Sequence, residues 1–294
     1  MTNKIGYVIL HYLSIEDTEE CVSSILNYSQ QKGCFVIIVD NCSPNNSGKI
    51  LCDNYKSDSR VKIIINDKNL GFSKGNNVGI KYARQVIGCD FVVVLNNDTY
   101  LMDDKFEQIV IEEYQKSVFA VLGPKVYDPD SYNASNPGNC ELPTIKECRN
   151  AVMIWAKALI KSYFPIYNVM PHSINEKSEE IKMAQEKAMN RKEFCRLHGC
   201  CLVFSPLYFQ YFSGFLERTF MYAEETILLI NLRKYNLKSV YSPNLHIFHK
   251  EAVVSKKVLG NTKSHKKCWL MLKASIALTR ELKKYLKVKK NDVE

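Results

Sequence analysis

The chain has 294 residues, of which 46% are hydrophobic and 24% charged, which is typical of an ordinary folded globular protein. No segment approaches the roughly 18–20 consecutive apolar residues of a membrane-spanning helix, and the N-terminus lacks the apolar core of a signal peptide. These features argue against an integral membrane or secreted protein and predict a cytoplasmic location. The net charge of +9 is concentrated in residues 256–294, where twelve Lys and Arg stand against three acids, so residues 1–255 are nearly neutral.

Residues 1–123 alternate between short β-branched runs and amphipathic segments. The runs predict strands at 5–10, 35–39, 61–65, 91–95 and 118–122, and the amphipathic segments predict helices at 16–28, 74–87 and 103–116. Strands separated by helices indicate an α/β fold with a mostly parallel central sheet covered by helices. In such a sheet the ligand lies beyond the carboxyl ends of the strands, which is where candidate functional residues are expected.

The second part of the chain begins with a less regular region at 124–193. It contains a loop rich in Pro, Asn, Ser and Gly at 128–138, an apolar and aromatic segment at 149–167, and a charged, helix-prone segment at 174–193. Regular patterns return with an apolar run at 194–204, a helical segment at 222–235 and strand-like runs at 239–241 and 245–248.

Polar residues follow two of the predicted strands. Asn96, Asn97 and Asp98 follow the strand at 91–95, where a carboxylate can coordinate a hard cation such as Mg²⁺ or Mn²⁺. Alternatively, these three residues form an ordinary turn, in which Asn and Asp are common. Asp40 ends the strand at 35–39, and its carboxylate can either accept the imide N–H of uracil or thymine or act as a helix cap or Asx-turn.

A glycine-rich segment lies at 69–79, between these two strand ends. Its glycines at 71, 75 and 79 match neither a Walker loop nor a G-x-G-x-x-G dinucleotide motif. The segment opens a predicted helix, so it permits a ligand to approach the backbone closely near a helix N-terminus.

Two further sets of polar residues lie near the C-terminal end of the body. Glu224 and Glu225 lie in the first turn of a predicted helix, where acidic residues commonly complement the helix dipole. If the two residues face the ligand crevice, one of them can instead act as a general base. His246 and His249 flank the end of a predicted strand, and each can be structural or a ligand.

The eleven cysteines are scattered along the chain. The nearest approach to a metal cluster consists of Cys195, His198, Cys200 and Cys201. The neighbouring residues Cys200 and Cys201 point to opposite faces of a strand, which is poor geometry for one zinc ion. Free, buried thiols in a reducing compartment are therefore predicted instead of a zinc cluster.

The order of these segments resembles the family-2 glycosyltransferases over most of residues 4–250. The segments that carry the resemblance are IGYVILHY, VIIVDNCSPNNSG, NLGFSKGNNVGI, VVVLNND and GFLERTFMYAEETILLINLRKYNLKSVYSPNLHIFHK. The resemblance implies the GT-A fold, with a nucleotide-binding half at 1–123 and an acceptor-binding half at 124–255. The basic residues 256–294 follow this domain as an amphipathic helical tail.

The resemblance also implies roles for individual residues. Asp40 would bind the pyrimidine base, with Asn41, Asn69, Gly75, Asn76 and Asn97 also contacting the donor. Asp98 and His249 would hold a divalent metal, Mn²⁺ or Mg²⁺. Because Asn96 stands where many relatives have Asp, Asp98 and His249 are expected to supply most of the coordination. Glu225 would be the catalytic base, and Glu224 would assist it or contact the acceptor.

The resemblance implies a reaction that transfers a sugar from dTDP-rhamnose or a UDP-hexose to a lipid-linked saccharide acceptor and inverts the anomeric configuration. The expected setting is the synthesis of a bacterial capsule or O-antigen. The lysines of 256–294, interleaved with Trp269 and several Leu residues, favour an anionic membrane surface as a partner, on the inner face of the plasma membrane. Nucleic acid is not an expected partner because no reading module is present. The alternative for residues 256–294 is a solvated tail that binds no membrane. The alternatives for the activity are a nucleotidyltransferase and a catalytically decayed protein that only binds a nucleotide sugar.

Overall fold

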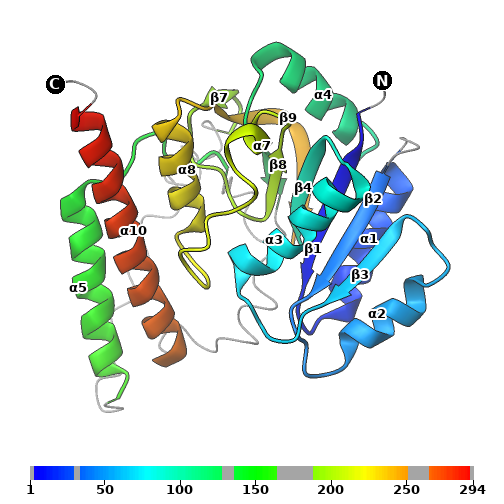
Figure 1. Cartoon of the computed structure of the whole chain (residues 1–294), viewed down its shortest axis with the longest axis horizontal. Coiled ribbons are helices and arrows are strands. Elements are labelled where there is room, and N and C mark those ends of the chain that lie inside the picture. The colour runs from blue at the N-terminus through cyan, green and yellow to red at the C-terminus, as the bar shows by residue number, and fades with distance from the viewer. Residues whose placement is uncertain (1–2, 30–33, 128–135, 164–187, 251–264, 292–294) are drawn as a thin grey trace.

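The computed structural model describes residues 3–29, 34–127, 136–163, 188–250 and 265–291. They form one mixed α/β structure around a curved central sheet (Figure 1). The strands are β1 (Ile5–His11), β2 (Cys34–Asp40), β3 (Val61–Ile65), β4 (Phe91–Asn96), β5 (Thr99–Leu101), β6 (Val121–Tyr127), β7 (Lys192–Glu193), β8 (Cys201–Phe204) and β9 (Ser239–His249). Their order in the sheet is β3-β2-β1-β4-β8-β6-β9-β5, and β7 pairs with β9.

Helices cover both faces of this sheet. The helices are α1 (Ile15–Tyr28), α2 (Ser47–Tyr55), α3 (Phe72–Tyr82), α4 (Phe106–Ser117), α5 (Ile145–Lys161), α7 (Tyr208–Tyr211), α8 (Glu224–Lys234) and α10 (His265–Asn291), with a π-helical turn, η1 (Ala83–Ile87), after α3. Helices α1, α2 and α4 pack on one face, and α3, α7 and α8 on the other. This arrangement confirms the predicted α/β fold.

Strands β1–β4 are parallel to one another, and β1, β2 and β4 are buried on both faces, as their continuous apolar sequences predict. Tyr7 and Ile9 of β1 face one hydrophobic cluster, and Val8 faces the other. The glycine spacing of α3 lets this helix lie directly on the sheet. A Cβ atom at Gly75 would lie 2.6 Å from Leu10, and one at Gly79 would lie 2.4 Å from Val8.

Some predicted boundaries were wrong. The fifth strand was predicted at 118–122, but β6 begins at Val121, because α4 continues to Ser117 and ends on Val118 in the left-handed conformation (φ 47°). The two strands predicted at 239–241 and 245–248 are the single strand β9. Its pairing with β6 shifts register between Pro124 and Lys125. Most of the segment 174–193 lies outside the described residues.

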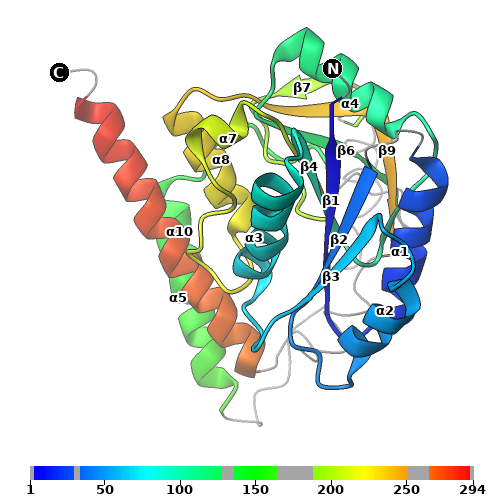
Figure 2. The ribbon, with the colours of Figure 1, turned by 45° about the vertical axis from the view of Figure 1, so that its right-hand side comes forward.

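Part of the basic C-terminal segment is integrated into the fold. Residues 265–291 form α10, which lies alongside α5 and also contacts α8, as two views show (Figures 1 and 2). Leu282 is buried against Cys148 of α5 and Ile230 of α8. None of the described helices combines the length and the apolar composition needed to cross a bilayer. Through its contacts with α5 and α8, helix α10 forms a further layer of the structure outside α8.

Candidate active site

A cavity of about 400 Å³ opens where the carboxyl ends of β1, β2 and β4 meet the end of β9 and the segment that enters β8. Seven of the predicted site residues line it: Asn41, Asn69, Asn97, Asp98, Glu224, Glu225 and His249. The position agrees with the rule that parallel sheets bind ligands at the carboxyl ends of their strands. The structure thus brings together residues that lie far apart in the sequence.

Asp98 and His249 face each other in this cavity. Asp98 Oδ1 lies 3.2 Å from His249 Nε2, and both side chains are buried. They are held by antiparallel pairing of β5 with β9, in which Thr99 lies opposite His249, and by a hydrogen bond from the Lys250 N–H to the Asp98 carbonyl. Strand pairing therefore fixes the distance between them.

The side chains around Asp98 fit a divalent cation. A cation between these two residues would be bound by His249 Nε2, the ring nitrogen that faces Asp98. The other ring nitrogen, Nδ1, is buried and has no hydrogen-bond partner among the described residues. Asn97 donates from its side chain to the Ser14 carbonyl and to Thr18 Oγ1, so its amide ties this loop to α1. Asp98 and His249 are the predicted residues positioned to hold a metal, because a carboxylate and an imidazole are common ligands of divalent metals.

Glu224 and Glu225 enter the cavity from the first turn of α8. The two residues before them, Tyr222 and Ala223, have positive φ values of 72° and 63°, an uncommon conformation for residues other than glycine. Glu225 Oε1 accepts a 2.6 Å hydrogen bond from the Gly199 N–H. The sharp turn before α8 thus directs both carboxylates toward the segment that leads into β8.

The two carboxyl groups differ in environment. Burial, with a smaller contribution from the negative charge of Glu225, raises the pKa of Glu224 from its ordinary value of 4.5 to about 7. Its Oε2 is buried without a hydrogen-bond partner among the described residues. Glu225 is half-buried, and its Oε2 lies 3.9 Å from Arg196 Nε. Two acids with different environments suit two different roles.

Asn41 organises the rim of the cavity. Its side-chain carbonyl accepts from the Leu70 N–H at 2.9 Å, and its amide donates to Asn69 Oδ1 and to the Gly71 carbonyl. Gly71 has a φ of 79°, and a Cβ atom there would lie 2.2 Å from the Phe220 carbonyl oxygen. This close approach holds the segment around Phe220 against the glycine-rich loop.

Three of the predicted donor-binding residues do not line the cavity. The Asp40 carboxylate accepts from the N–H and the hydroxyl of Ser43, an Asx-turn arrangement. Gly75 packs against Leu10. Asn76 is fully buried and donates to the Phe72 carbonyl. In this structure these three residues support the loops around the cavity.

Other residues line the cavity that the sequence did not single out for this role. His198 and Cys200 lie in the segment before β8, and Lys266 lies at the start of α10. Aromatic side chains of Tyr12, Phe72, Phe220 and Tyr222 form more of the wall. Lys266 carried no distinguishing signal within a run of lysines, because only the packing of α10 brings it to the cavity.

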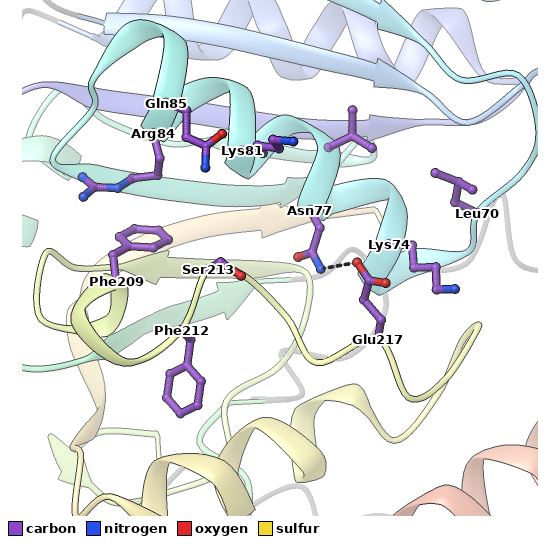
Figure 3. A pocket seen from close by; sticks show the side chains of 11 residues that line it. Leu70, Lys74, Asn77, Lys81, Arg84, Gln85, Phe209, Phe212, Ser213 and Glu217 are labelled. Carbon is purple, nitrogen blue, oxygen red and sulfur yellow. Dashed lines mark hydrogen bonds between the residues drawn. The ribbon is translucent and has the colours of Figure 1, made fainter.

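A second and larger cavity, of about 710 Å³, lies between α3 and the segment after α7 (Figure 3). Arg84 lies over the ring of Phe209 there, 4.5 Å from its centre, and Asn77 donates to Glu217. Lys74 and Lys81 add positive charge. It contains none of the predicted site residues and no carboxylate pair, so the smaller cavity is the candidate active site.

Comparisons with known proteins bear on the family and the fold of the chain. The family model described as glycosyl transferase family 2 matches residues 7–212. The chain is 22% identical over 237 residues to the low-salt glycan biosynthesis hexosyltransferase Agl10 of Haloferax volcanii, covering 81% of this chain and 64% of that protein. It is also 22% identical over 259 residues to the N-acetylglucosaminyl-diphospho-decaprenol L-rhamnosyltransferase of Mycobacterium tuberculosis, covering 86% and 78%.

Solved structures show the same fold. GalNAc-T7 with UDP, GalNAc and Mn²⁺ has a TM-score of 0.59 at 11% identity, covering 92% of this chain and 47% of that one. TarS residues 1–349 of S. aureus has a TM-score of 0.51 at 15% identity, covering 93% and 70%. The fold is thus GT-A-like, as predicted. With more than half of its length matched by the family model, the chain belongs to glycosyltransferase family 2.

Proposed function

We propose that the chain is an inverting glycosyltransferase that binds a nucleoside-diphosphate sugar in the 400 Å³ cavity. The observation that carries this proposal is the convergence of Asp98 and His249 with Glu224 and Glu225 on one cavity at the carboxyl ends of the strands. A transferase of this kind needs a positive centre for the leaving diphosphate and a base for the acceptor hydroxyl. Both requirements have candidate residues within the same cavity.

Glu225 is the proposed base. Its carboxylate takes the proton of the acceptor hydroxyl as the oxygen attacks the anomeric carbon, and the bond to the diphosphate breaks with its electron pair leaving on the diphosphate. The Gly199 N–H bond orients this carboxylate. Glu224, which holds a proton over much of the neutral range, is suited to donate a hydrogen bond to the acceptor. Direct displacement inverts the anomeric configuration.

Asp98 and His249 are proposed to hold Mn²⁺ or Mg²⁺, which would neutralise charge on the diphosphate. Lys266, which lines the same cavity, adds a cation from α10. Asn41, Asn69 and Asn97 lie along the wall, with Asp40, Gly75 and Asn76 supporting them. The donor proposed for the first trials is dTDP-rhamnose, with UDP-hexoses as the second group, because relatives named both as a rhamnosyltransferase and as a hexosyltransferase match this chain.

The acceptor is proposed to be a lipid-linked saccharide presented at the inner face of a bacterial plasma membrane, as in capsule or O-antigen synthesis. The surface of α5 and α10 supports this proposal, since apolar side chains are exposed beside lysines there. The exposed apolar residues are Met153, Ile154 and Ile160 on α5 and Trp269, Leu286 and Val288 on α10. Exposed apolar side chains on two neighbouring lysine-containing helices suit an anionic bilayer surface.

Vesicle flotation tests the membrane proposal. The triple substitution Lys283→Glu, Lys284→Glu and Lys287→Glu on α10 should release the protein from anionic phospholipid vesicles. The same triple Lys→Glu change at exposed lysines far from this surface, Lys49, Lys56 and Lys62, should leave binding intact. Equal binding by both variants would remove α10 from the membrane contact.

Incubation with UDP-, dTDP- and GDP-sugars plus Mn²⁺ tests the catalytic proposal, with released nucleoside diphosphate as the readout. Release from one donor is expected, faster with a saccharide acceptor. A protein that binds a donor but releases nothing with any acceptor would be the non-catalytic alternative. Release of pyrophosphate from a nucleoside triphosphate and a sugar phosphate would indicate a nucleotidyltransferase.

A further inference from the structure

The segment before β8 brings two potential metal ligands to the cavity beside His249. One donor atom each from His198, Cys200 and His249 lie within 4.8 Å of one another. Cys200 and His249 are buried, and His198 is half-buried at the cavity wall. Zinc bound by sulfur at about 2.3 Å and by nitrogen at about 2.0–2.1 Å requires its ligands to lie within a few ångströms of one another. The three side chains need only a small adjustment to reach this arrangement.

Backbone pairing holds these ligands in place. The Asn96 N–H donates to the Cys200 carbonyl, and Cys201, the next residue, lies opposite Leu95 in the pairing of β4 with β8. The Cys200 N–H lies 3.2 Å from His198 Nδ1. His249 ends β9 and is fixed through its pairing with Thr99. Residues held next to paired strands are positioned more precisely than residues on a free loop.

The surroundings of His249 are those of a metal-bound histidine. Its Nε2 lies 3.2 Å from Asp98 Oδ1, so a carboxylate can accept the proton of this nitrogen. Its other nitrogen, Nδ1, is buried without a hydrogen-bond partner among the described residues. In metalloproteins a ligating histidine usually donates its second ring N–H to a carboxylate in this way. Nδ1 is thus the nitrogen left for a cation.

The donor set also distinguishes between metals. Hard cations such as Mg²⁺ prefer oxygen ligands, whereas two imidazoles and a thiolate are typical of Zn²⁺. Two of the three acids that line the cavity are already engaged, since Asp98 lies against His249 and Glu225 accepts from Gly199. The cavity leaves room for a fourth, exchangeable ligand, as in zinc sites of enzymes.

We propose that His198, Cys200 and His249 form a binding site for Zn²⁺ or a similar borderline cation, with Asp98 orienting His249 and the fourth position facing the cavity. Binding converts the Cys200 thiol to a thiolate, and its proton passes to the buffer. The site lies in the wall of the proposed donor cavity and shares His249 with the proposed Mn²⁺ or Mg²⁺ site, so one chain holds one of the two metals at a time. Binding of Zn²⁺ needs no sugar transfer. It can therefore be tested whether or not the proposed function is correct.

Cobalt substitution tests the site directly. The full chain, freed of metal with a chelator, is titrated with Co²⁺, and the thiolate-to-cobalt charge-transfer band in the near ultraviolet is recorded. One Co²⁺ per chain with this band is expected, and Zn²⁺ should displace it. Calorimetry in two buffers of different ionisation enthalpy should show release of about one proton per Zn²⁺.

Substitutions separate this site from the other thiols of the chain. Cys200→Ser should remove the band and weaken Zn²⁺ binding by about tenfold or more, and His198→Asn should weaken binding comparably. The matched controls are Cys201→Ser, a neighbouring buried cysteine outside the group, and His246→Asn, on the same strand as His249. Both controls should keep the band. Circular dichroism confirms folding, and Cys200→Ala replaces Cys200→Ser if the serine variant fails to fold.

A cobalt complex without the charge-transfer band, or a band lost equally in Cys201→Ser, would overturn the proposal. Tighter binding of Mg²⁺ or Mn²⁺ than of Zn²⁺, unaffected by Cys200→Ser, would do the same. Transfer activity with Mn²⁺ but no thiolate band would refute this site and retain the proposed function. Zinc binding with the expected band in a protein that transfers no sugar would support the site and refute the proposed function.

Discussion

The carboxylate of Glu225 accepts a 2.6 Å hydrogen bond from the backbone N–H of Gly199, which ties the first turn of α8 to the segment entering β8. The bond holds the proposed base in the cavity and orients one oxygen, while Oε2 lies toward Arg196 at 3.9 Å. The proposed base is thus held in position by the backbone of a second segment.

Glu225→Gln should bind the donor normally and lose turnover. An amide of the same size keeps the shape of the site but cannot accept the acceptor proton, so kcat should fall by about 10²–10⁴. Donor binding is measured by calorimetry and turnover by released nucleoside diphosphate. Glu217→Gln, at an exposed acid in the second cavity, is the control and should keep normal turnover. Near-normal kcat in Glu225→Gln would remove Glu225 from this role.

Glu224→Gln should make the protein more stable at alkaline pH. Because the folded-state pKa is raised from 4.5 to about 7, the folded protein binds the extra proton between these values. The stabilisation is complete below pH 4.5 and is lost as the pH rises through 7. An uncharged glutamine avoids this loss. The difference in free energy of unfolding between the variant and the unsubstituted chain should therefore be about 1–3 kcal/mol more in favour of the variant at pH 8 than at pH 5.

Urea unfolding of Glu224→Gln and the unsubstituted chain at pH 5 and pH 8 measures this difference. A variant that changes stability equally at both pH values would show that Glu224 titrates in the folded protein as it does in the unfolded chain.

Asp98→Asn should abolish the metal-dependent part of donor binding. The substitution keeps the size of the side chain but removes the charge beside His249. Calorimetry with a nucleoside-diphosphate sugar, with and without Mn²⁺, should show a metal-dependent gain in affinity for the unsubstituted chain that is missing from the variant. Asp103→Asn, at an acid whose Oδ2 lies 3.8 Å from His246 Nδ1, should retain the gain. The same metal-dependent gain in both variants would exclude Asp98 as a ligand.

Lys266→Ala should weaken donor binding by about three- to tenfold, because it removes a cation from the cavity wall. The loss should shrink as the salt concentration rises, since exposed charges are screened. Lys273→Ala is the control on the same helix, where the lysine lies over the ring of Trp269 at 3.6 Å. If both substitutions weaken binding equally, the effect belongs to the overall charge of α10 rather than to the cavity.

Leu282→Ala should destabilise the whole protein, because this side chain is 1% exposed and packs between α5 and α8. Loss of a buried leucine costs about 2–5 kcal/mol. Leu286→Ala, one turn further along α10 where the side chain is 44% exposed, should cost little. Thermal unfolding followed by circular dichroism compares the two. Equal and small effects would show that α10 does not contribute to the stability of the body.

Much of the fold was predictable from local patterns. Strands β1, β2 and β4 bury both faces, so they appear as continuous apolar runs, and the predicted strand at 61–65 matches β3 residue for residue. The glycines at 75 and 79 marked a place of close approach, although the partners they meet are strand side chains of Leu10 and Val8. The helices between the strands were predicted because their apolar residues recur at helical spacing.

The sequence by itself determined the sheet and its helices, the order of the polar strand ends, and the pairing of two acids at the start of a helix. These features can be predicted because they depend on the spacing of apolar residues within a short segment and on the order of the segments along the chain. Only the tertiary structure decided that His198 and Cys200 stand beside His249, and that α10 packs on α5 and brings Lys266 to the cavity. Those contacts depend on antiparallel pairing and helix packing between distant segments, and no local pattern records where such segments meet.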